Sequence, residues 1–201
     1  LDPPKFTTVP GGIYFGKLNV DLHAIPDGVS DDVRLKAPIP SQLYLPAYLP
    51  FPARCPLVMK VKDQGKLAAV QAQQAIMLRF LTSIPPGKVR FTIVDPVGLG
   101  DNFAAFMHLA DYDEQLVGAR IWTEASQIEK KLSDLTAHME NVIQKYLRNQ
   151  YKSIEEYNEQ AGEVAEPYRV LVVANFPTNF SSDAARRLVS IVSSGHFICV
   201  L

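Results

Sequence analysis

The chain has 201 residues, of which 47% are hydrophobic, 20% charged and 9% aromatic. This is the composition of a globular protein, and it excludes a disordered chain, a collagen and a coiled-coil fibre. Twenty Lys and Arg residues against 21 Asp and Glu leave a net charge of −1, which argues against a protein that holds nucleic acid by bulk positive charge. We expect neither a transmembrane helix nor a secretory signal, because no apolar run approaches the ~18 residues that a membrane-spanning helix needs.

The cysteines favour a reducing compartment. Cys55 and Cys199 are far apart and form no CxxC motif, so both are expected to be buried core thiols in a cytoplasmic protein. The four histidines show no ligand spacing, and we expect no metal site. The chain begins at Leu1 and stops inside an apolar stretch at Leu201, which predicts a piece of a longer protein and is compatible with a membrane-anchored parent.

The N-terminal quarter is rich in proline. Ten of the 15 prolines lie within residues 1–56, and proline fixes φ and removes a backbone donor, so regular structure should be short there. Residues 13–22 alternate well enough for one or two short strands, and residues 38–56 predict an extended strap. We expect an arm over residues 1–45 that lies across a core domain of residues 46–201. Six large arm residues should then be buried on that core: Tyr14, Phe15, Tyr44, Leu45, Tyr48 and Phe51.

The core domain is predicted to alternate strands and helices. The expected elements are a strand at 57–61, a nearly all-apolar helix at 67–82 buried against a sheet, a strand at 89–94 and a short helical piece at 102–109.

The second half continues the alternation. A capping box at Ser126 and Glu129 starts a helix of about 25 residues with one apolar stripe, and a box at Ser153 and Glu156 starts a short helix to residue 160. A strand at 168–173, a helix at 183–194 capped by Ser182 and closed by Gly195, and a strand at 197–201 complete the order. This order predicts an α/β fold, a mainly parallel sheet with helices on both faces.

Several of these segments resemble one known family. The strand 89–94 that ends in Asp95-Pro96, the series Met139-Glu140, Tyr146, Arg148 and Tyr157-Asn158, the strand 171–173 and the Ala- and Arg-rich helix 184–195 occur in its order. From about Pro56 onward they resemble the FtsK/SpoIIIE (HerA–FtsK) group of RecA-like P-loop ATPases. The resemblance implies a RecA-like P-loop NTPase-type core.

The nucleotide-binding motif of that family is degenerate here. A working loop reads G-x-x-x-x-G-K-[ST], in which bare amides and Lys hold phosphates and the hydroxyl holds Mg²⁺. In one register Gly65-Lys66 match the Gly-Lys pair and Leu67 takes the hydroxyl position. In the preferred register, residues 63–70, Asp63 replaces the first glycine and Val70 replaces the hydroxyl. Neither register supplies the Mg²⁺ ligand.

The second catalytic motif is degenerate as well. Family members that hydrolyse ATP end the Walker B strand with Asp-Glu, whereas this strand ends in Ala174-Asn175, and neither side chain is a general base. We therefore expect no catalytic residue and no cofactor, with ATP and Mg²⁺ as the alternative.

Eight residues stay as site candidates, each beside a plainer interpretation. Asp63, Gln64, Gly65 and Lys66 form either a vestigial phosphate cradle or a solvated turn. Asp95 and Asn175 are polar candidates at the sheet edge, although Asp95 can also simply end a strand. Arg186 and Arg187 either reach a neighbouring subunit or form the wet side of a helix. The acidic residues of 155–166 should be a solvated surface that repels DNA.

The resemblance implies a pseudo-motor domain, a structural, regulatory or partner-docking module of a larger ATPase assembly. Its partners would be other domains or subunits, including a ring of identical copies, with weak DNA binding and no membrane contact. Two alternatives stay open: an active ATP-dependent DNA translocase of the chromosome-segregation and cell-division type with a non-standard loop, and an interaction domain without a ligand.

Overall fold

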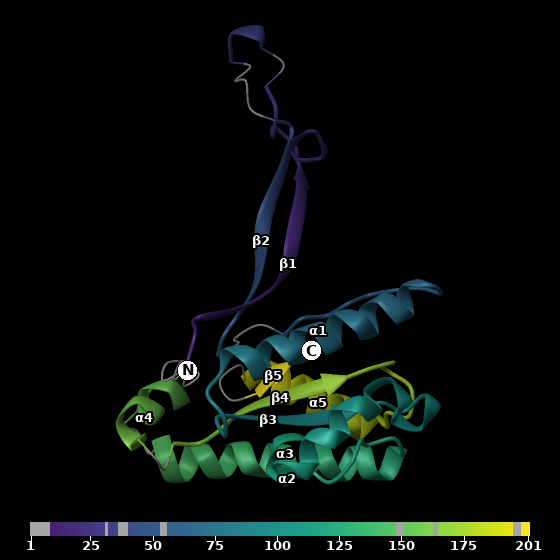
Figure 1. Ribbon diagram of the computed structural model, residues 1–201, viewed down its shortest axis with the longest axis vertical. Helices are drawn as coiled ribbons and strands as arrows, with labels where there is room; N and C mark the ends of the chain where they lie inside the picture. Colours follow the sequence, from purple (N-terminus) through teal and green to yellow (C-terminus); the bar gives the residue numbers. More distant parts are fainter. Residues whose placement is uncertain are drawn as a thin grey trace, which may run out of the picture.

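The computed structural model describes residues 9–30, 32–35, 40–52, 56–147, 151–162, 165–194 and 198–201. It consists of an α/β core and a β-ribbon that projects from it (Figure 1). Within those ranges no helix is both long and apolar enough to cross a membrane. Some predictions fall on residues outside the described ranges, namely those for Cys55, Arg148, Glu163, Gly195, His196 and Phe197.

A three-stranded parallel sheet forms the centre of the core. Its order is β3 (Val89–Val94), β4 (Tyr168–Val173) and β5 (Ile198–Val200), with β4 in the middle. Strands β3 and β4 pair over their whole length, and most of their residues are buried, as is typical of a parallel sheet covered on both faces. The predicted α/β fold class is confirmed, and so are the predicted bounds of β3 and β4.

Helices cover both faces of the sheet (Figure 1). Helix α1 (Gly65–Ser83) packs with Phe91 and Ile93 of β3 on one face, whereas α3 (Ala125–Val142) and α5 (Ser182–Ser194) pack with Leu171 of β4 on the other. The shorter helices are η1 (Leu22–Ala24), η2 (Val33–Leu35), η3 (Gly98–Asp111), α2 (Glu114–Val117), the π-helical turn η4 (Ile143–Leu147) and α4 (Ile154–Ala161).

Helix α3 confirms its predicted stripe and corrects its predicted cap. The stripe residues Ile128, Leu132, Leu135, Met139 and Val142 are all buried. The N-cap is Glu124, which makes no side-chain cap bond, so the predicted capping box is wrong. The carboxylate of Glu129 instead accepts a hydrogen bond from Ser181 Oγ at 2.6 Å.

Of the other two predicted helix N-caps, the one at α4 is confirmed and the one at α5 is not. Ser153 Oγ accepts the Glu156 N–H at 3.3 Å, which confirms the predicted start of α4. At α5, Ser181 rather than Ser182 accepts the Ala184 N–H at 3.0 Å, so the predicted cap is one residue too late.

Helix α1 is buried on one side only. Gln73, Ile76, Met77 and Phe80 are buried, but Leu67 and Leu78 are 64% and 54% exposed. The prediction that this helix is buried against the sheet is confirmed for that side. The apolar residues on its other side are exposed, because a sheet contacts only one side of a helix and nothing in the described chain covers the other. Residues 57–61 form no strand, so the prediction of a strand there is wrong. Their link to the described strands of the sheet is one backbone hydrogen bond, in which the Leu57 N–H donates to Val200 O at 3.0 Å.

The N-terminal segment forms a long antiparallel ribbon. Strand β1 (Gly12–Asp21) pairs with β2 (Gln42–Pro50) over its whole length, and a bulge between Tyr14 and Gly16 shifts the register by one residue, so that Ile13 and Gly16 share a side. The ribbon projects away from the core, so the prediction of an arm that lies across it is wrong (Figure 1). Strand β2 contains prolines because its outer edge has no neighbour and needs no donor there. It also runs through residue 46, where the arm was expected to end.

Only the base of the ribbon is buried. Ile13, Leu49 and Phe51 lie in the core, with the Phe51 ring centroid 5.1 Å from that of Phe80. The burial predicted for Phe51 is thus confirmed, whereas Tyr14 and Phe15 are half-buried. The burial predicted for Tyr44, Leu45 and Tyr48 is wrong, since these three side chains are exposed.

Candidate functional site

The carboxyl edge of the sheet brings two of the predicted site residues together. Asp95 follows β3 directly and Asn175 lies just beyond β4. Asp95 is fully buried; its Oδ1 accepts a hydrogen bond from Asn175 Nδ2 at 3.2 Å, and its Oδ2 accepts one from Asn102 Nδ2 at 3.0 Å. The predicted edge residues therefore bond to each other, with an asparagine from η3 as a third member.

Backbone geometry holds these side chains in place. The Ala174 N–H donates to Val94 O at 2.9 Å, which extends the β3–β4 ladder past the end of β4, and the Asp95 N–H donates at 3.0 Å to the O of Trp122, which bridges Val94. Asn175 then adopts a positive φ of 57°, a conformation that asparagine tolerates better than most residues. The chain leaves the sheet at this point while the Asn175 side chain stays beside Asp95.

Two glutamines of α1 also donate hydrogen bonds at this edge of the sheet. Gln73 is 6% exposed and donates to Val173 O at 3.1 Å, and Gln74 donates to Asn102 O. Sequence reasoning missed both glutamines and Asn102. A signal existed for Gln73, which shares the buried helix side with Ile76, Met77 and Phe80. We call Asp95, Asn102, Asn175, Gln73 and Gln74 the edge cluster.

The edge cluster is a network of amides hydrogen-bonded around or beside one carboxylate. It contains one carboxylate and four amides, and amides neither titrate nor act as general bases. Both oxygens of Asp95 already accept hydrogen bonds. Mg²⁺ demands octahedral oxygen coordination, and this donor set offers no hydroxyl and no second carboxylate, so the residues do not fit a nucleotide-bound Mg²⁺. The described residues also include no group of three His, Cys, Asp or Glu placed to hold a metal ion.

The predicted phosphate loop lies elsewhere on the same helix. Residues 63–66 are at the N-terminus of α1, about eight residues before Gln73, which is ~12 Å along a helix axis. The amides of Gly65 and Lys66 donate to Lys62 O and Asp63 O at 2.9 and 3.1 Å, and Gln64 at the N-cap makes no side-chain cap bond. Asp63 and Lys66 are exposed. The structure therefore forms a turn here and does not join it to the edge cluster.

The two candidate arginines also lie apart from the edge cluster. Arg186 and Arg187 belong to α5, which packs with α3 on the sheet face opposite α1. Arg186 is exposed and pairs with Asp183 of its own helix, whereas Arg187 is half-buried.

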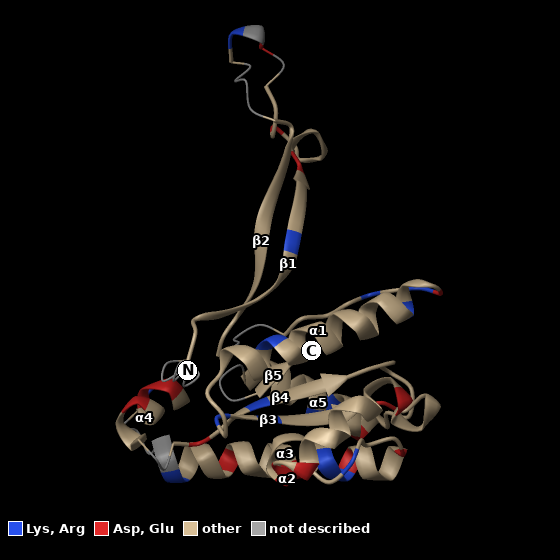
Figure 2. Cartoon of the chain, viewed as in Figure 1, with Lys and Arg blue, Asp and Glu red and all other residues tan. Residues whose placement is uncertain are grey.

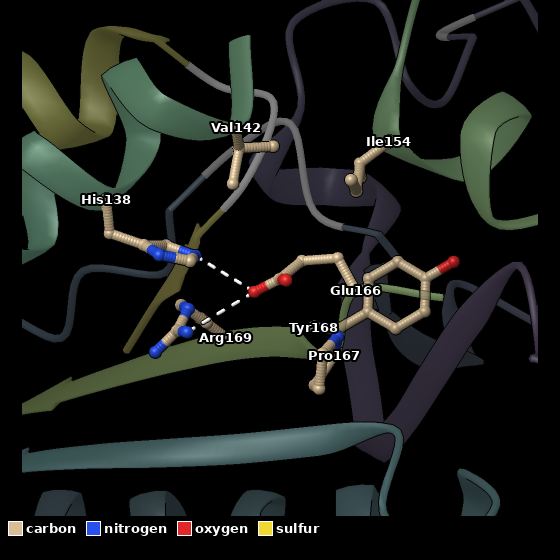
Figure 3. Close-up of a pocket in the computed structure, with 7 residues that line it drawn as sticks. All are labelled: His138, Val142, Ile154, Glu166, Pro167, Tyr168 and Arg169. Atoms are coloured by element: carbon tan, nitrogen blue, oxygen red, sulfur yellow. Dashed lines mark hydrogen bonds and ion pairs between the residues drawn. The ribbon is translucent and has the colours of Figure 1, made fainter. Parts of the chain in front are cut away.

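A second polar network, not predicted from the sequence, ties α3 to the start of β4. Glu166 Oε1 accepts His138 Nε2 at 2.9 Å and the Arg169 guanidinium at 3.3 Å (Figure 3). Burial raises the pKa of Glu166, but the His138 and Arg169 interactions outweigh burial and hold that pKa below its ordinary value of 4.5. The prediction of a solvated acidic stretch is thus wrong for Glu166, although Glu159 is exposed.

The lowered pKa of Glu166 predicts a stability loss in acid. The carboxylate stabilises the fold fully above pH 4.5, and this contribution is lost as the pH falls through the lower pKa of the folded state. Glu166→Gln should lower the free energy of unfolding by about 1–3 kcal/mol at pH 7, and its deficit against the unmodified chain should shrink below pH 4.5. Urea titrations at several pH values measure this, with the exposed Glu140→Gln on α3 as control. A deficit independent of pH would contradict the assignment.

Comparison with known proteins gives one family and one fold. The model of the FtsK/SpoIIIE family matches residues 62–197. The structure of the pCW3 conjugation coupling protein TcpA, in its monomer form with ATPgS, is similar with a TM-score of 0.51 and 18% identity, over 77% of this chain and 44% of that one. This chain thus spans less than half of that chain, and no curated protein matches it. The structural likeness supports a P-loop NTPase-type fold. Because the family match covers well over half of the residues, the chain belongs to the FtsK/SpoIIIE family.

Proposed function

We propose that this chain is a catalytically degenerate FtsK/SpoIIIE-type ATPase domain that acts as a structural, regulatory or partner-docking module of a larger ATPase assembly. The assembly would contain other domains or subunits of the same family. We further propose that residues 46–201 form the motor-like unit and residues 1–45 its arm, with β2 running across this boundary, and that the domain works in the cytoplasm.

The edge cluster is the observation that carries this proposal. Where hydrolysing relatives need an Asp-Glu pair, this chain has Ala174-Asn175, and the Asn175 side chain is bonded to the buried Asp95. A second observation points the same way: the Gly65 and Lys66 amides, which would face phosphates in a working loop, donate to turn carbonyls.

The purified chain should therefore show no Mg²⁺-dependent ATP hydrolysis above a blank without protein. Neither motif supplies a Mg²⁺ ligand or a general base, so the chemical step has no catalyst in this domain. A coupled phosphate-release assay with a calorimetric ATP titration measures hydrolysis and binding separately. Lys66→Ala is the matched variant, and Lys62→Ala is its control on the same exposed segment. A turnover of even about 1 s⁻¹ that Lys66→Ala abolishes and Lys62→Ala leaves unchanged would overturn the proposal.

Duplex DNA should bind this chain weakly. A net charge of −1 supplies few phosphate contacts, so affinity should be no tighter than the non-specific range of about 10⁻⁴–10⁻⁶ M at physiological salt. Fluorescence anisotropy with a labelled duplex over a salt series measures this. Nanomolar, salt-sensitive binding would instead favour an active DNA translocase.

A further inference from the structure

The β-ribbon has one side made entirely of apolar residues. Directly opposed residues of an antiparallel pair share a side, and so do residues two apart along a strand. One side is mixed and carries Asn19 opposite Tyr44, Lys17 opposite Pro46 and Tyr14 opposite Tyr48. The other side carries the pairs Ile13–Leu49, Gly16–Ala47, Leu18–Leu45 and Val20–Leu43.

The apolar side is fully buried only at its base; farther out, Val20 and Leu43 are half-buried and Leu18 and Leu45 are exposed. Ile13 and Leu49 are 1% and 4% exposed, but farther out Leu18 and Leu45 are 55% and 46% exposed. We call Leu18, Val20, Leu43 and Leu45 the ribbon face. An isolated two-stranded ribbon is marginally stable in water, so its apolar face indicates a surface that another element covers.

Helix α1 presents a second uncovered surface of similar length. Its exposed side carries two leucines, an alanine, a glutamine and a threonine at spacings of three and four, and only Lys66 and Arg79 are charged in the whole helix. Solvated helix sides normally carry many charges. Nineteen residues of helix and the ribbon from Ile13 to Asp21 both span about 30 Å. We call Leu67, Gln71, Ala75, Leu78 and Thr82 the α1 outer face.

Charges at the ends of the two surfaces are complementary. Among the described residues, the ribbon tip carries the exposed Asp21 and Asp27 and an Asp32–Arg34 ion pair, a net charge of −2. The segment that enters α1 carries Lys60, Lys62 and Lys66 against Asp63, a net charge of +2. Figure 2 shows acidic residues at the far end of the ribbon and basic residues around the start of α1.

The ribbon does not cover its own α1. It leaves the core near the C-terminal end of that helix and rises away from it, so the tip and the basic segment of one chain stay apart (Figure 1). The complementary surfaces can therefore meet between two chains.

We propose that two copies of this chain exchange ribbons, so that the ribbon face of each packs on the α1 outer face of the other. The acidic tip then lies over residues 60–66 of the partner, which sets the direction of packing. A ribbon about 10 Å wide and 30 Å long covers roughly 300 Å² on each partner. One such contact buries about 600 Å² in total, too little for a stable complex, whereas the reciprocal two-fold exchange buries about 1,200 Å², the lower end of the stable range. This association does not depend on whether the edge cluster binds nucleotide.

The first test compares two matched ribbon variants by analytical ultracentrifugation. Measurements at chain concentrations up to about 100 µM detect dimers whose dissociation constants are up to about that value. The unmodified chain should dimerise. Leu18→Glu with Leu45→Glu should raise the dissociation constant at least about tenfold, because it buries two charges in the interface. Asn19→Glu with Tyr44→Glu adds the same charges at the neighbouring pair on the opposite side and should leave the dimer intact. A monomeric unmodified chain, or equal losses in both variants, would overturn the proposal.

The second test changes only exposed charged side chains, of which Asp21 also caps η1 by accepting the His23 N–H at 3.0 Å. Asp21→Lys with Asp27→Lys should weaken self-association, and so should Lys60→Glu with Lys62→Glu, because each places like charges together. A mixture of the two variants should regain the affinity of the unmodified chain, since both reciprocal contacts then join opposite charges. Failure of the mixture to regain it would exclude the exchange and leave a ribbon-to-ribbon contact as the alternative. Circular dichroism confirms that each variant is folded.

Discussion

Replacing Asp95 with alanine should destabilise the chain, because two half-buried amide donors lose a charged acceptor. Asp95 is fully buried and accepts hydrogen bonds from Asn102 and Asn175. Hydrogen bonds to charged groups contribute about 1.5–3 kcal/mol each, and half-buried amides can bond partly to water instead, so we expect the free energy of unfolding to fall by about 2–4 kcal/mol. Urea unfolding followed by circular dichroism measures the change.

The control for this variant is the exposed Asp101→Ala in η3, which should change the free energy of unfolding by no more than about 0.5 kcal/mol. If Asp95→Ala leaves stability unchanged but abolishes an ATP affinity of the unmodified chain, Asp95 is a ligand-binding carboxylate. The edge cluster would then be a site and not a structural network.

The parallel strands and the long helix were predictable because their signals are local. Residues 89–94 and 168–173 are apolar runs with clear ends, and the first is stopped by Asp95-Pro96. The stripe of α3 follows helical spacing over five turns, and all of its described members are buried. A buried run or stripe depends on the segment alone, so the sequence is sufficient for these elements.

The caps show where local patterns fail. Ser126 and Glu129 have the spacing of a capping box, yet Glu129 accepts a hydrogen bond from Ser181 of another segment. The same serine caps α5 in place of its neighbour Ser182. One hydroxyl serves two helices, and this depends on how α3 packs against α5, which neither segment encodes by itself.

The candidate site was half predictable for a similar reason. Parallel strands end at one edge of a sheet, and this topology predicts that Asp95 and Asn175 lie close together. The amides of Gln73 and Asn102 reach the same point only because α1 and η3 pack over that edge. The hydrogen-bonded turn at Gly65 likewise depends on the path of the preceding segment, which makes no strand.

The prediction for the ribbon was wrong because we expected the core to be the packing partner of its alternating strands. An alternating strand needs one covered side, and we expected the core to cover it along its length. Strands β1 and β2 instead pair with each other, and the core covers only the residues near Ile13 and Leu49. Stability should therefore depend on the base of the ribbon and not on its outer half.

Ile13→Ala should accordingly lower the free energy of unfolding by about 2–5 kcal/mol, the usual cost of truncating a fully buried isoleucine. For a chain of this size that is a fall in melting temperature of about 4–20 °C. The control is Tyr44→Ala, at a side chain that is 65% exposed on the side of the ribbon opposite Ile13, and it should change the melting temperature by no more than a few degrees.

Trimming residues 1–40 should have an effect at least as large as that of Ile13→Ala. It removes the whole of β1, so Leu49 and Phe51 lose a neighbour in the core, and β2 loses the one strand with which it pairs among the described residues. We expect a lower melting temperature and more binding of an apolar dye. A trimmed chain that melts at the same temperature and stays equally soluble would show that the ribbon is a linker. The core would then be complete without it, because burial of Ile13 would contribute nothing to the fold.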